Sequence, residues 1–498
     1  MESKWGSRMT PLLFIFTLVF ALTGASVSAQ QVWSAHYGGV FNDGGYGCVA
    51  TPDNGYAAAG STFSYGSGNF DVYLLALDSL GDTLWTRSIG DTLSEYGRDI
   101  QNTPDGGFII AGSTNSNGNG KEDVLVIRTD RFGNTLWMKT YGGKQSDEAW
   151  SIRPTPDSGY IVCGTTYSSG HGFGDLFLLK ISAQGDSLWS KAYGGPGGES
   201  GYAVRVTPDG GLIAVGATGS FGTGYSSLYA VRTTSTGDSL WATTFGGAKA
   251  DLGYTVELGI DGGFLFAGVT APAGSAFYDM YVVKSDDNGN LQWERNYGGA
   301  KEDCAYGIAT TIDGNYLIAG STESSGAGAV DMFVVKIDPA GNEISEATYG
   351  GRQNDYCRSV VVDHTGRYLL AGFTYSYSQG GSDFYLVGTQ GDEPTDVFER
   401  GGNGLPSGFA LEQNYPNPFN MSSRIQFSIP ARATVTVTIY NILGQEVRQW
   451  PQENLSAGQY TVEWDGFSDS GTPAASGVYF YRIDAGTYSA SRKMVLLK

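Results

Sequence analysis

Residues 189–240 read WSKAYGGPGGESGYAVRVTPDGGLIAVGATGSFGTGYSSLYAVRTTSTGDSL, and this pattern recurs along most of the 498-residue chain. A Trp returns every 52 residues, and the step after the sixth one falls on Ser345; the six are Trp33, Trp85, Trp137, Trp189, Trp241 and Trp293. Gly and Thr keep the same interval through seven copies, at Gly60, Gly112, Gly164, Gly216, Gly268, Gly320 and Gly372 and at Thr62, Thr114, Thr166, Thr218, Thr270, Thr322 and Thr374. A fixed period of this length indicates that each copy is one supersecondary unit.

Each copy parses into four strands separated by glycine-rich turns. In the quoted stretch we expect strands at Leu188–Tyr193, Tyr202–Thr207, Leu212–Thr218 and Leu228–Thr233. Several such strands are apolar at most positions instead of alternating, which predicts burial on both faces of the sheet.

Seven four-stranded sheets that bury both faces predict an all-β seven-bladed β-propeller, with a linear β-solenoid as the alternative. A tight turn joins the fourth strand of each copy to the next Trp strand, so these two strands belong to one sheet. The segment Val32–Tyr37 is then left without a sheet, and the last copy, about residues 358–388, lacks a strand. We therefore predict that the N-terminal strand completes the seventh sheet and removes an open edge.

The repeated tryptophans are expected to wedge between neighbouring sheets, and Trp189→Ala is expected to cost about 3–5 kcal/mol. A ring of indoles that stack on sugars is the alternative. With its glycine turns and spaced Trp, the repeat resembles those of bacterial repeat β-propellers, including quinoprotein-type blades. This resemblance implies a fold and no particular activity.

The net charge of −20 lies in the repeats, because residues 408–498 hold seven acidic and seven basic side chains. A region this acidic repels phosphate backbones, which argues against nucleic-acid binding.

The first 29 residues have the features of a signal peptide. Basic side chains precede an apolar run at residues 12–22, and small residues at 27–29 precede the expected cleavage site. We expect an exported chain that starts at Gln30, with a short transmembrane anchor as the alternative.

Four cysteines, Cys48, Cys163, Cys304 and Cys357, fall in or beside expected strands without metal-ligand spacing. We expect buried thiols, and a disulfide between Cys304 and Cys357 stays open.

Two acidic positions recur with the repeat. One precedes the innermost strand in all copies, at Asp43, Glu95, Asp147, Glu199, Asp251, Asp303 and Asp355. The other precedes the fourth strand in six copies, at Asp71, Asp123, Asp175, Asp279, Asp331 and Asp383. Because strands alternate in direction, both sets should lie at one end of the ring, here called the top face. The carboxylates either fix loops by accepting N–H bonds or, in the first set, offer oxygen ligands to Ca²⁺; no other cofactor is expected.

Signatures of catalysis are not found in the sequence, so we expect no enzymatic activity. The three histidines, His36, His171 and His364, lie in unrelated register, and neither a nucleophile elbow nor a phosphate loop occurs. Because many carboxylates occur in pairs, glycosidase activity stays an alternative. Polar aromatics in the top loops could contact a sugar or a protein, with ordinary solvated loops as the alternative: Tyr167, His171, Tyr375 and Tyr377.

The composition changes after a Gly-, Pro- and acid-rich linker at residues 391–408. Residues 414–420 read NYPNPFN, residues 477–481 read GVYFY, and residues 493–498 read KMVLLK. Alternating apolar residues between these strings predict a small antiparallel, Ig-like β-sandwich over residues 409–498.

These strings, in this order, closely resemble the type A C-terminal sorting domain of the type IX secretion system. The residues that carry the resemblance are Asn414, Tyr415, Pro416, Asn417, Pro418, Phe419, Asn420, Gly477, Val478, Tyr479, Lys493 and Lys498. Met421 departs from the family, which usually has Pro at this position. The resemblance implies the type IX machinery as a partner and a location outside the cell or on the outer-membrane surface. A sandwich used only for binding is the alternative.

The expected organisation is a signal peptide (1–29), a propeller (30–390), a linker (391–408) and a sorting domain (409–498). We predict a secreted or cell-surface, non-catalytic propeller that binds an unidentified protein or glycan through its top face. An extracellular polysaccharide hydrolase or lyase and a structural surface-layer component are the alternatives.

Overall fold

The computed structural model describes residues 31–271, 277–378, 380–389, 399–401, 409–414, 417, 419, 423–455, 458–469, 472–486 and 488–497. Every regular element in these ranges is a β-strand, and no helix among them is long and apolar enough to cross a bilayer. The predicted signal peptide and most of the predicted linker lie outside the described residues.

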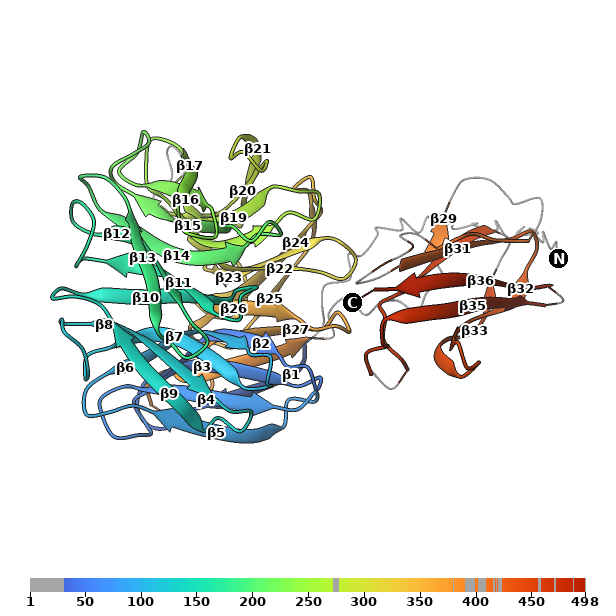
Figure 1. The fold of residues 1–498 in the computed structure, drawn as a ribbon, viewed down its shortest axis with the longest axis horizontal. Coiled ribbons are helices and arrows are strands. Elements are labelled where there is room, and N and C mark those ends of the chain that lie inside the picture. The colour runs from blue at the N-terminus through green and yellow to red at the C-terminus, as the bar shows by residue number, and fades with distance from the viewer. Residues whose placement is uncertain are drawn as a thin grey trace, which may run out of the picture.

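Residues 31–389 form seven four-stranded antiparallel sheets (Figure 1). The first sheet contains β2 (Asp43–Ala50), β3 (Tyr56–Thr62), β4 (Asp71–Leu77) and β5 (Thr83–Ile89), side by side in chain order. The second and third contain β6 (Glu95–Asn102), β7 (Phe108–Thr114), β8 (Asp123–Thr129) and β9 (Thr135–Tyr141), then β10 (Asp147–Pro154), β11 (Tyr160–Thr166), β12 (Asp175–Ile181) and β13 (Ser187–Tyr193).

The fourth sheet contains β14 (Glu199–Val206), β15 (Leu212–Thr218), β16 (Ser227–Thr233) and β17 (Ser239–Phe245). The fifth and sixth contain β18 (Asp251–Leu258), β19 (Phe264–Thr270), β20 (Asp279–Ser285) and β21 (Leu291–Tyr297), then β22 (Asp303–Thr310), β23 (Tyr316–Thr322), β24 (Asp331–Ile337) and β25 (Glu343–Tyr349). The seventh contains β26 (Asp355–Val362), β27 (Tyr368–Thr374), β28 (Asp383–Thr389) and the N-terminal strand β1 (Gln31–Tyr37).

The N-terminal strand closes the ring. β1 pairs antiparallel with β28, so that Trp33 lies opposite Gly388 and Tyr37 opposite Phe384. The innermost strands β2, β6, β10, β14, β18, β22 and β26 contact one another in succession, and β26 contacts β2. The predicted all-β class, the propeller-like arrangement and the closure by the N-terminal strand are confirmed.

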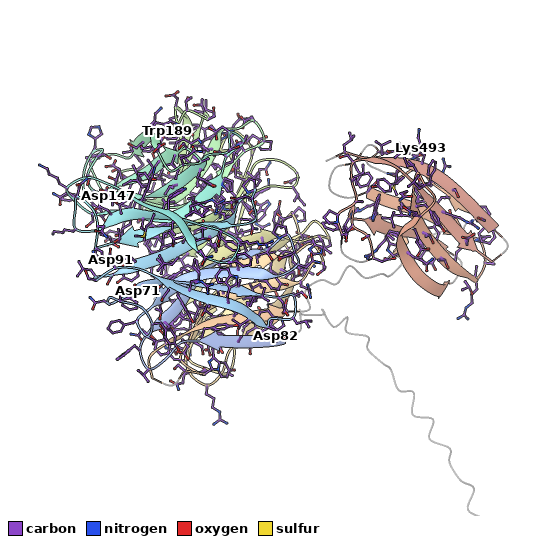
Figure 2. All side chains as sticks on the ribbon, turned by 60° about the horizontal axis from the view of Figure 1, so that its bottom comes forward. Asp71, Asp82, Asp91, Asp147, Trp189 and Lys493 are labelled. Carbon is purple, nitrogen blue, oxygen red and sulfur yellow. The ribbon has the colours of Figure 1, made fainter. Side chains whose placement is uncertain are left out.

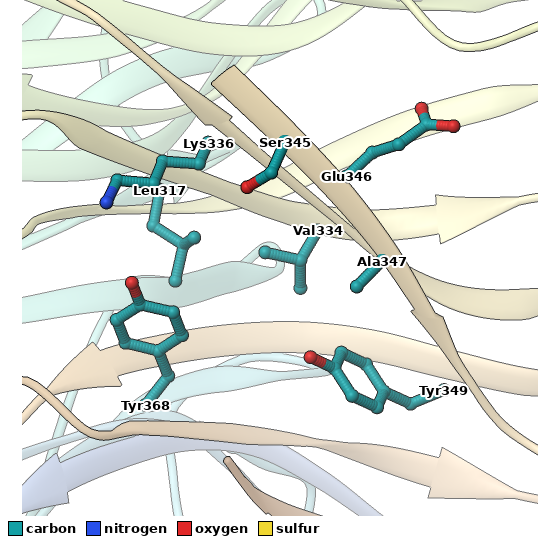
Figure 3. A pocket seen from close by; sticks show the side chains of 8 residues that line it. All are labelled: Leu317, Val334, Lys336, Ser345, Glu346, Ala347, Tyr349 and Tyr368. Atoms are coloured by element: carbon teal, nitrogen blue, oxygen red, sulfur yellow. The ribbon is translucent and has the colours of Figure 1, made fainter. Parts of the chain in front are cut away.

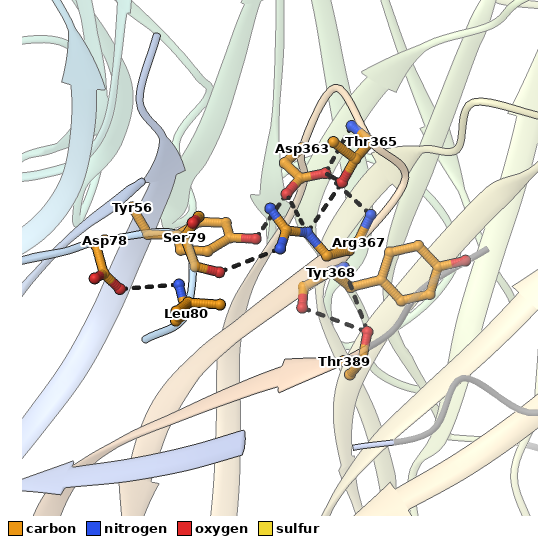
Figure 4. Close-up of polar contacts among 9 residues, drawn as sticks. All are labelled: Tyr56, Asp78, Ser79, Leu80, Asp363, Thr365, Arg367, Tyr368 and Thr389. Atoms are coloured by element: carbon orange, nitrogen blue, oxygen red, sulfur yellow. Dashed lines mark hydrogen bonds and ion pairs between the residues drawn. The ribbon is translucent and has the colours of Figure 1, made fainter. Parts of the chain in front are cut away.

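A polar network at the base of the closing sheet ties it to the first sheet (Figure 4). The Tyr56 hydroxyl donates to Asp363 Oδ2 at 2.7 Å, and Arg367 Nε donates to the same oxygen at 3.0 Å. Arg367 Nη1 also reaches the carbonyl of Ser79 at 3.2 Å. Chain segments about 300 residues apart in sequence are thereby joined by charge-assisted hydrogen bonds.

The two middle strands of each sheet form the core. Every residue of β3 and β4 is buried, whereas β5 at the outer edge is half-buried or exposed. Each core cluster combines two sheets; for example, Ala59 and Leu74 of the first sheet share a cluster with Ile110 and Leu125 of the second. Burial on both faces explains why these strands are apolar at successive positions.

The tryptophans lie between neighbouring sheets, as predicted, but they are only half-buried. Trp189 packs against a cluster drawn from the third and fourth sheets and covers Gly237 in the β16–β17 turn of the fourth sheet. Figure 2 marks Trp189 on the ring. Because part of each indole stays in water, the expected cost of Trp189→Ala falls below the 3–5 kcal/mol expected for full burial.

The missing seventh tryptophan leaves a small hollow. Ser345 occupies the Trp position in the sixth sheet, and it lines a cavity of about 10 Å³ with Leu317, Tyr349 and Tyr368 (Figure 3). The neighbouring seventh sheet ends with β1, which comes from the other end of the chain, so no hairpin turn joins it to β28. In the other sheets, the Trp covers a glycine in the last hairpin turn of the next sheet. The sixth sheet has Ser in place of Trp, and its neighbour, the seventh sheet, has no such turn.

The tail folds into two four-stranded sheets packed face to face, an Ig-like sandwich as predicted. One sheet has the order β29 (Glu399–Gly401), β34 (Gly458–Trp464), β31 (Ser423–Ile429) and β30 (Ala410–Leu411). The other has the order β33 (Glu446–Leu455), β32 (Ala433–Asn441), β35 (Gly477–Ala485) and β36 (Tyr488–Leu496). A single core joins them, with Trp464 and Tyr481 fully enclosed. β29 lies within the range expected to be linker, yet it pairs with β34.

Candidate functional site: an axial channel

The first set of predicted acidic residues opens the seven inner strands and is buried in every sheet. Each carboxylate accepts hydrogen bonds both from its own sheet and from the loop that precedes its strand. The Glu199 carboxylate accepts from the Thr218 hydroxyl at 2.7 Å and from the backbone N–H of Gly195 at 2.7 Å. Asp355 likewise accepts from the Ser376 hydroxyl and the Gly351 N–H, both at 2.7 Å. These bonds hold the top loops against the ends of the strands, which explains the invariant Thr.

The second acidic set lies at the same end of the ring, as expected from strand direction. Asp71 and Asp147 mark this end in Figure 2, whereas Asp82, in the β4–β5 turn, marks the opposite end. Within the described residues, no three His, Cys, Asp or Glu side chains come together as a metal ion would require.

Carboxylates of the two sets face one another across neighbouring sheets. A Cβ added at Gly38 would lie 2.1 Å from Asp383 Oδ1 and 2.7 Å from Asp43 Oδ2, so both oxygens border the same glycine. Asp383 Oδ1 is buried without a hydrogen-bond partner. Burial and the neighbouring Asp43 raise the pKa of Asp383 to about 6, although His36, 3.7 Å away, acts in the opposite direction.

A channel of about 470 Å³ runs along the inner strands, and the sequence analysis did not identify it. A β-bulge occurs at the same place in each inner strand, where one extra residue faces the channel. The seven bulge residues recur at the interval of the repeat: Tyr46, Arg98, Trp150, Tyr202, Tyr254, Tyr306 and Arg358. We call them the bulge ring.

The repeated glycine makes these bulges possible. A Cβ on Gly216 would lie 1.7 Å from the carbonyl oxygen of Ser200, just before the bulge at Tyr202. The same short approach recurs in the other sheets, for example between Gly112 and the carbonyl of Tyr96 at 1.7 Å. A bulge bends its strand and re-aims the extra side chain. The glycine therefore connects the sequence repeat to the lining of the channel.

Four successive members of the bulge ring form an aromatic arc. The ring centroids of Trp150 and Tyr202 are 5.7 Å apart, and those of Tyr202 and Tyr254 are 5.1 Å apart, both with edge-to-face geometry. Tyr254 and Tyr306 are stacked at 5.1 Å. Aromatic side chains usually bury such faces in a core. Here all four are half-buried and line an open channel.

Arg98 and Arg358 close the two ends of this arc, with Tyr46 between them on the other side of the ring. The Arg98 guanidinium lies 3.9 Å from the Trp150 ring centroid, and that of Arg358 lies 4.1 Å from the Tyr306 centroid. Neither arginine forms an ion pair with any residue that the structure describes. The Nε atom of Arg358 is buried without a hydrogen-bond partner. The ring thus has a cationic side and an aromatic side.

The acidic side chains near the channel are either shifted in pKa or paired with arginines. Burial raises the pKa of Glu148, assisted by Glu122 and opposed by Arg98. Below the bulge ring, Arg153 forms an ion pair with Asp99, and Arg205 Nη2 lies 3.0 Å from Glu257. Asp99 and Glu257 are therefore neutralised within the channel wall.

The predicted loop aromatics are exposed, and Tyr377 and His171 form contacts within the top loops. Tyr377 stacks on His36 at 6.3 Å and donates to the carbonyl of Gly350 at 3.1 Å. The backbone N–H of His171 donates to Asp175 at 2.8 Å. Tyr167 and Tyr375 are 49% and 37% exposed and lie apart from the channel lining.

All four cysteines are free thiols in this structure, and no disulfide joins Cys304 to Cys357 in it. Cys48, Cys163 and Cys357 are buried as expected, whereas Cys304 is only half-buried.

The described residues of the predicted sorting motif are integrated into the sandwich. Asn414 is buried and donates to the Ser423 hydroxyl at 2.7 Å. Asn417 accepts from the backbone N–H of Val495 at 2.9 Å, and Phe419 lies in the core. Gly477, Val478 and Tyr479 open β35, which pairs with β36 and its Lys493. The remaining motif residues, Tyr415, Pro416, Pro418, Asn420 and Lys498, lie outside the described residues.

Comparison with known proteins finds similarities for the tail and for a larger share of the chain. Residues 419–489 match the family of FlgD Ig-like domains. The regulatory protein FlaEY of Caulobacter vibrioides is 25% identical in an alignment 380 positions long, which covers 61% of this chain and 39% of that protein. The chain therefore spans well under half the length of this curated relative.

Among solved structures, the chain is similar to PorZ, a surface component of the type IX secretion system of Porphyromonas gingivalis. The identity is 12% and the TM-score 0.35, with 89% of this chain and 64% of that chain covered. It is also similar to Sqt1 from Chaetomium thermophilum, with 14% identity, a TM-score of 0.40, and coverage of 69% and 82%. These similarities assign no function.

Proposed function

We propose that this protein is an exported, non-catalytic binding protein whose ligand enters the axial channel of a seven-bladed propeller. The observation that carries the proposal is the bulge ring. Two positions that fix the local backbone, those of Gly216 and Thr218, hold one residue type through all seven copies. The bulge position instead varies among Tyr, Trp and Arg while it keeps large side chains that face an open space. Its volume falls within the range of about 300–1,000 Å³ typical of ligand pockets.

The absence of a catalytic role is part of the proposal. Polysaccharide cleavage by two carboxyl groups requires one free acid and one free base or nucleophile close together. The carboxylates of the channel wall, Asp99 and Glu257, each face an arginine and belong to strands three sheets apart. This arrangement favours binding over hydrolysis.

An array of glycans and peptides probed with the chain from residue 30 to 498 tests the binding role. We expect a limited set of ligands whose signal is lost in a Tyr202→Ala, Tyr254→Ala double variant and kept in Tyr225→Ala, a change at a 91% exposed loop residue. Circular dichroism checks that both variants are folded. Ligands that bind equally to the double variant, or a surface that captures nothing, would reject the channel as the binding site.

The proposed export route rests on the tail motif, and it has its own test. Residues 405–498 are fused to a periplasmic reporter in a bacterium with an active type IX system. We expect the reporter at the cell surface or in the medium, and we expect retention when the fusion ends at residue 476, before β35 and β36. Retention of the complete fusion would leave the tail as a binding sandwich only.

A further inference from the structure

We propose that the bulge ring recognises a carboxylated sugar, the uronate end of an acidic glycan, with its carboxylate on Arg98 and Arg358 and its ring on the aromatic arc. This inference rests on the proposed binding function and specifies the ligand.

The charge distribution points to an anion. Residues 30–407 are strongly acidic, yet the channel holds four arginines. Two of these are neutralised by Asp99 and Glu257 deeper in the channel. Arg98 and Arg358 form no ion pair among the described residues, and their guanidinium carbons lie 3.9 Å and 4.1 Å from the ring centroids of Trp150 and Tyr306. Arg98 also acts electrostatically on Glu148, which is not among the residues that line the channel. A guanidinium group can bind a carboxylate through two N–H donors.

The acidic surroundings limit the charge of the ligand. A polyanion such as a nucleic acid is repelled by the whole region, and a duplex exceeds a channel of about 470 Å³. One or two carboxylates satisfy two arginines at a much smaller electrostatic cost.

The opposite side of the ring points to a sugar. The C–H faces of a pyranose pack on aromatic side chains, and Trp150, Tyr202, Tyr254 and Tyr306 line the channel along four successive sheets. The hydroxyls of three tyrosines, with Gln101 and Thr255 in the same lining, offer donors and acceptors for the sugar hydroxyls. A purely apolar acid would leave these polar groups without partners.

Calorimetric titration of the chain from residue 30 to 498 tests the ligand class with three probes. Trigalacturonate carries rings and carboxylates, galactotriose carries rings only, and tricarballylate carries carboxylates only. We expect trigalacturonate to bind at least tenfold more tightly than either of the others. If galactotriose bound as tightly as trigalacturonate, the arginines would contribute nothing to binding. If tricarballylate bound as tightly, the site would recognise the carboxylates alone and not the sugar.

Variants locate the interaction. Arg98→Gln with Arg358→Gln should weaken trigalacturonate binding at least tenfold, whereas Arg87→Gln, which removes an arginine that packs on Trp85 outside the channel, should leave it unchanged. Tyr254→Ala keeps both cations, so it should weaken trigalacturonate but not tricarballylate. It serves as the second variant if the double arginine change impairs folding. Undiminished binding in both would overturn the proposal.

The experiments distinguish a wrong ligand class from a wrong binding function. If a neutral glycan or a peptide binds in a manner that depends on Tyr202, the channel is a binding site and the acidic-sugar inference is wrong. If no ligand depends on the bulge ring, both are wrong.

Discussion

At the scale of single residues, two glycines in turns with the same backbone conformation differ in what surrounds them. Gly210 and Gly237 have φ values of 80° and 78°. A Cβ on Gly210 would meet nothing within 4 Å, whereas one on Gly237 would lie 2.8 Å from the Trp189 indole. Gly210 is required only for the backbone conformation of its turn. Gly237 is required for its turn and also leaves room for the Trp189 indole between the sheets.

We expect Gly210→Ala to lower the free energy of unfolding by about 1–2 kcal/mol, the cost of a left-handed conformation with a side chain. Gly237→Ala should cost about 1–3 kcal/mol more, because the methyl group displaces Trp189 as well. Urea unfolding followed by circular dichroism measures both. Equal losses would show that the indole is not held against the turn.

Trp189 itself is half-buried, with the Lys191 ammonium 5.8 Å from its ring. We expect Trp189→Ala to cost about 2–3 kcal/mol, less than the loss of a fully enclosed indole. The same urea experiment gives the value. Trp464→Ala in the core of the tail, where the indole is fully buried, should cost more and is the comparison to make.

At the scale of elements, the bulge in each inner strand depends on the glycine that faces it. We expect Gly216→Ala to destabilise the protein by about 3 kcal/mol or more, since the added methyl group would overlap the Ser200 carbonyl at 1.7 Å. Thermal unfolding measures the loss, and Gly247→Ala is the control because nothing lies within 4 Å of its Cβ position. A midpoint as high as that of the control would mean that the inner strand can straighten without penalty.

The carboxylate at the start of β28 should make stability depend on pH. The pKa of Asp383 is about 6 in the folded protein, above the ordinary value of about 4, so the folded state holds more protons between these values. The stability that its protonation contributes is present at pH 4 and lost as the pH rises through 6. Asp383→Asn should therefore raise the free energy of unfolding at pH 7 by about 2 kcal/mol and much less at pH 4.

Asp209 offers a control of opposite sign. Hydrogen bonds from Thr207, Gly211 and Arg232 lower the pKa of Asp209 to about 2. Its contribution is present above pH 4 and is lost as the pH falls towards 2. Asp209→Asn should thus destabilise the protein at pH 7, where Asp383→Asn stabilises it. Thermal midpoints from pH 3 to 8 record both, and parallel profiles for the two variants would contradict the assignment.

At the scale of the whole molecule, stability depends on joining the two ends of the repeat array. Without β1, β28 would expose a sheet edge, and Trp33 would no longer cover Gly81 in the first sheet. We expect a chain that starts at residue 39 to unfold at a much lower temperature than one that starts at residue 30. A chain that starts at residue 30 and ends at residue 398 should keep the propeller transition of the longer protein. An unchanged midpoint after removal of β1 would show that the ring does not need closure.

The sequence alone determined the repeat, the four strands of each copy and the closure by the first strand, because these follow from local period and turn chemistry. The strand Leu212–Thr218 has the expected bounds, and the acidic residues lie at the expected end. The sequence placed the tryptophans correctly between the sheets but overestimated their burial, because part of each indole stays in water. Only the tertiary structure revealed the bulge ring. Its seven members are 52 residues apart, and they become neighbours only because seven sheets close around one axis and each bulge turns one side chain towards it.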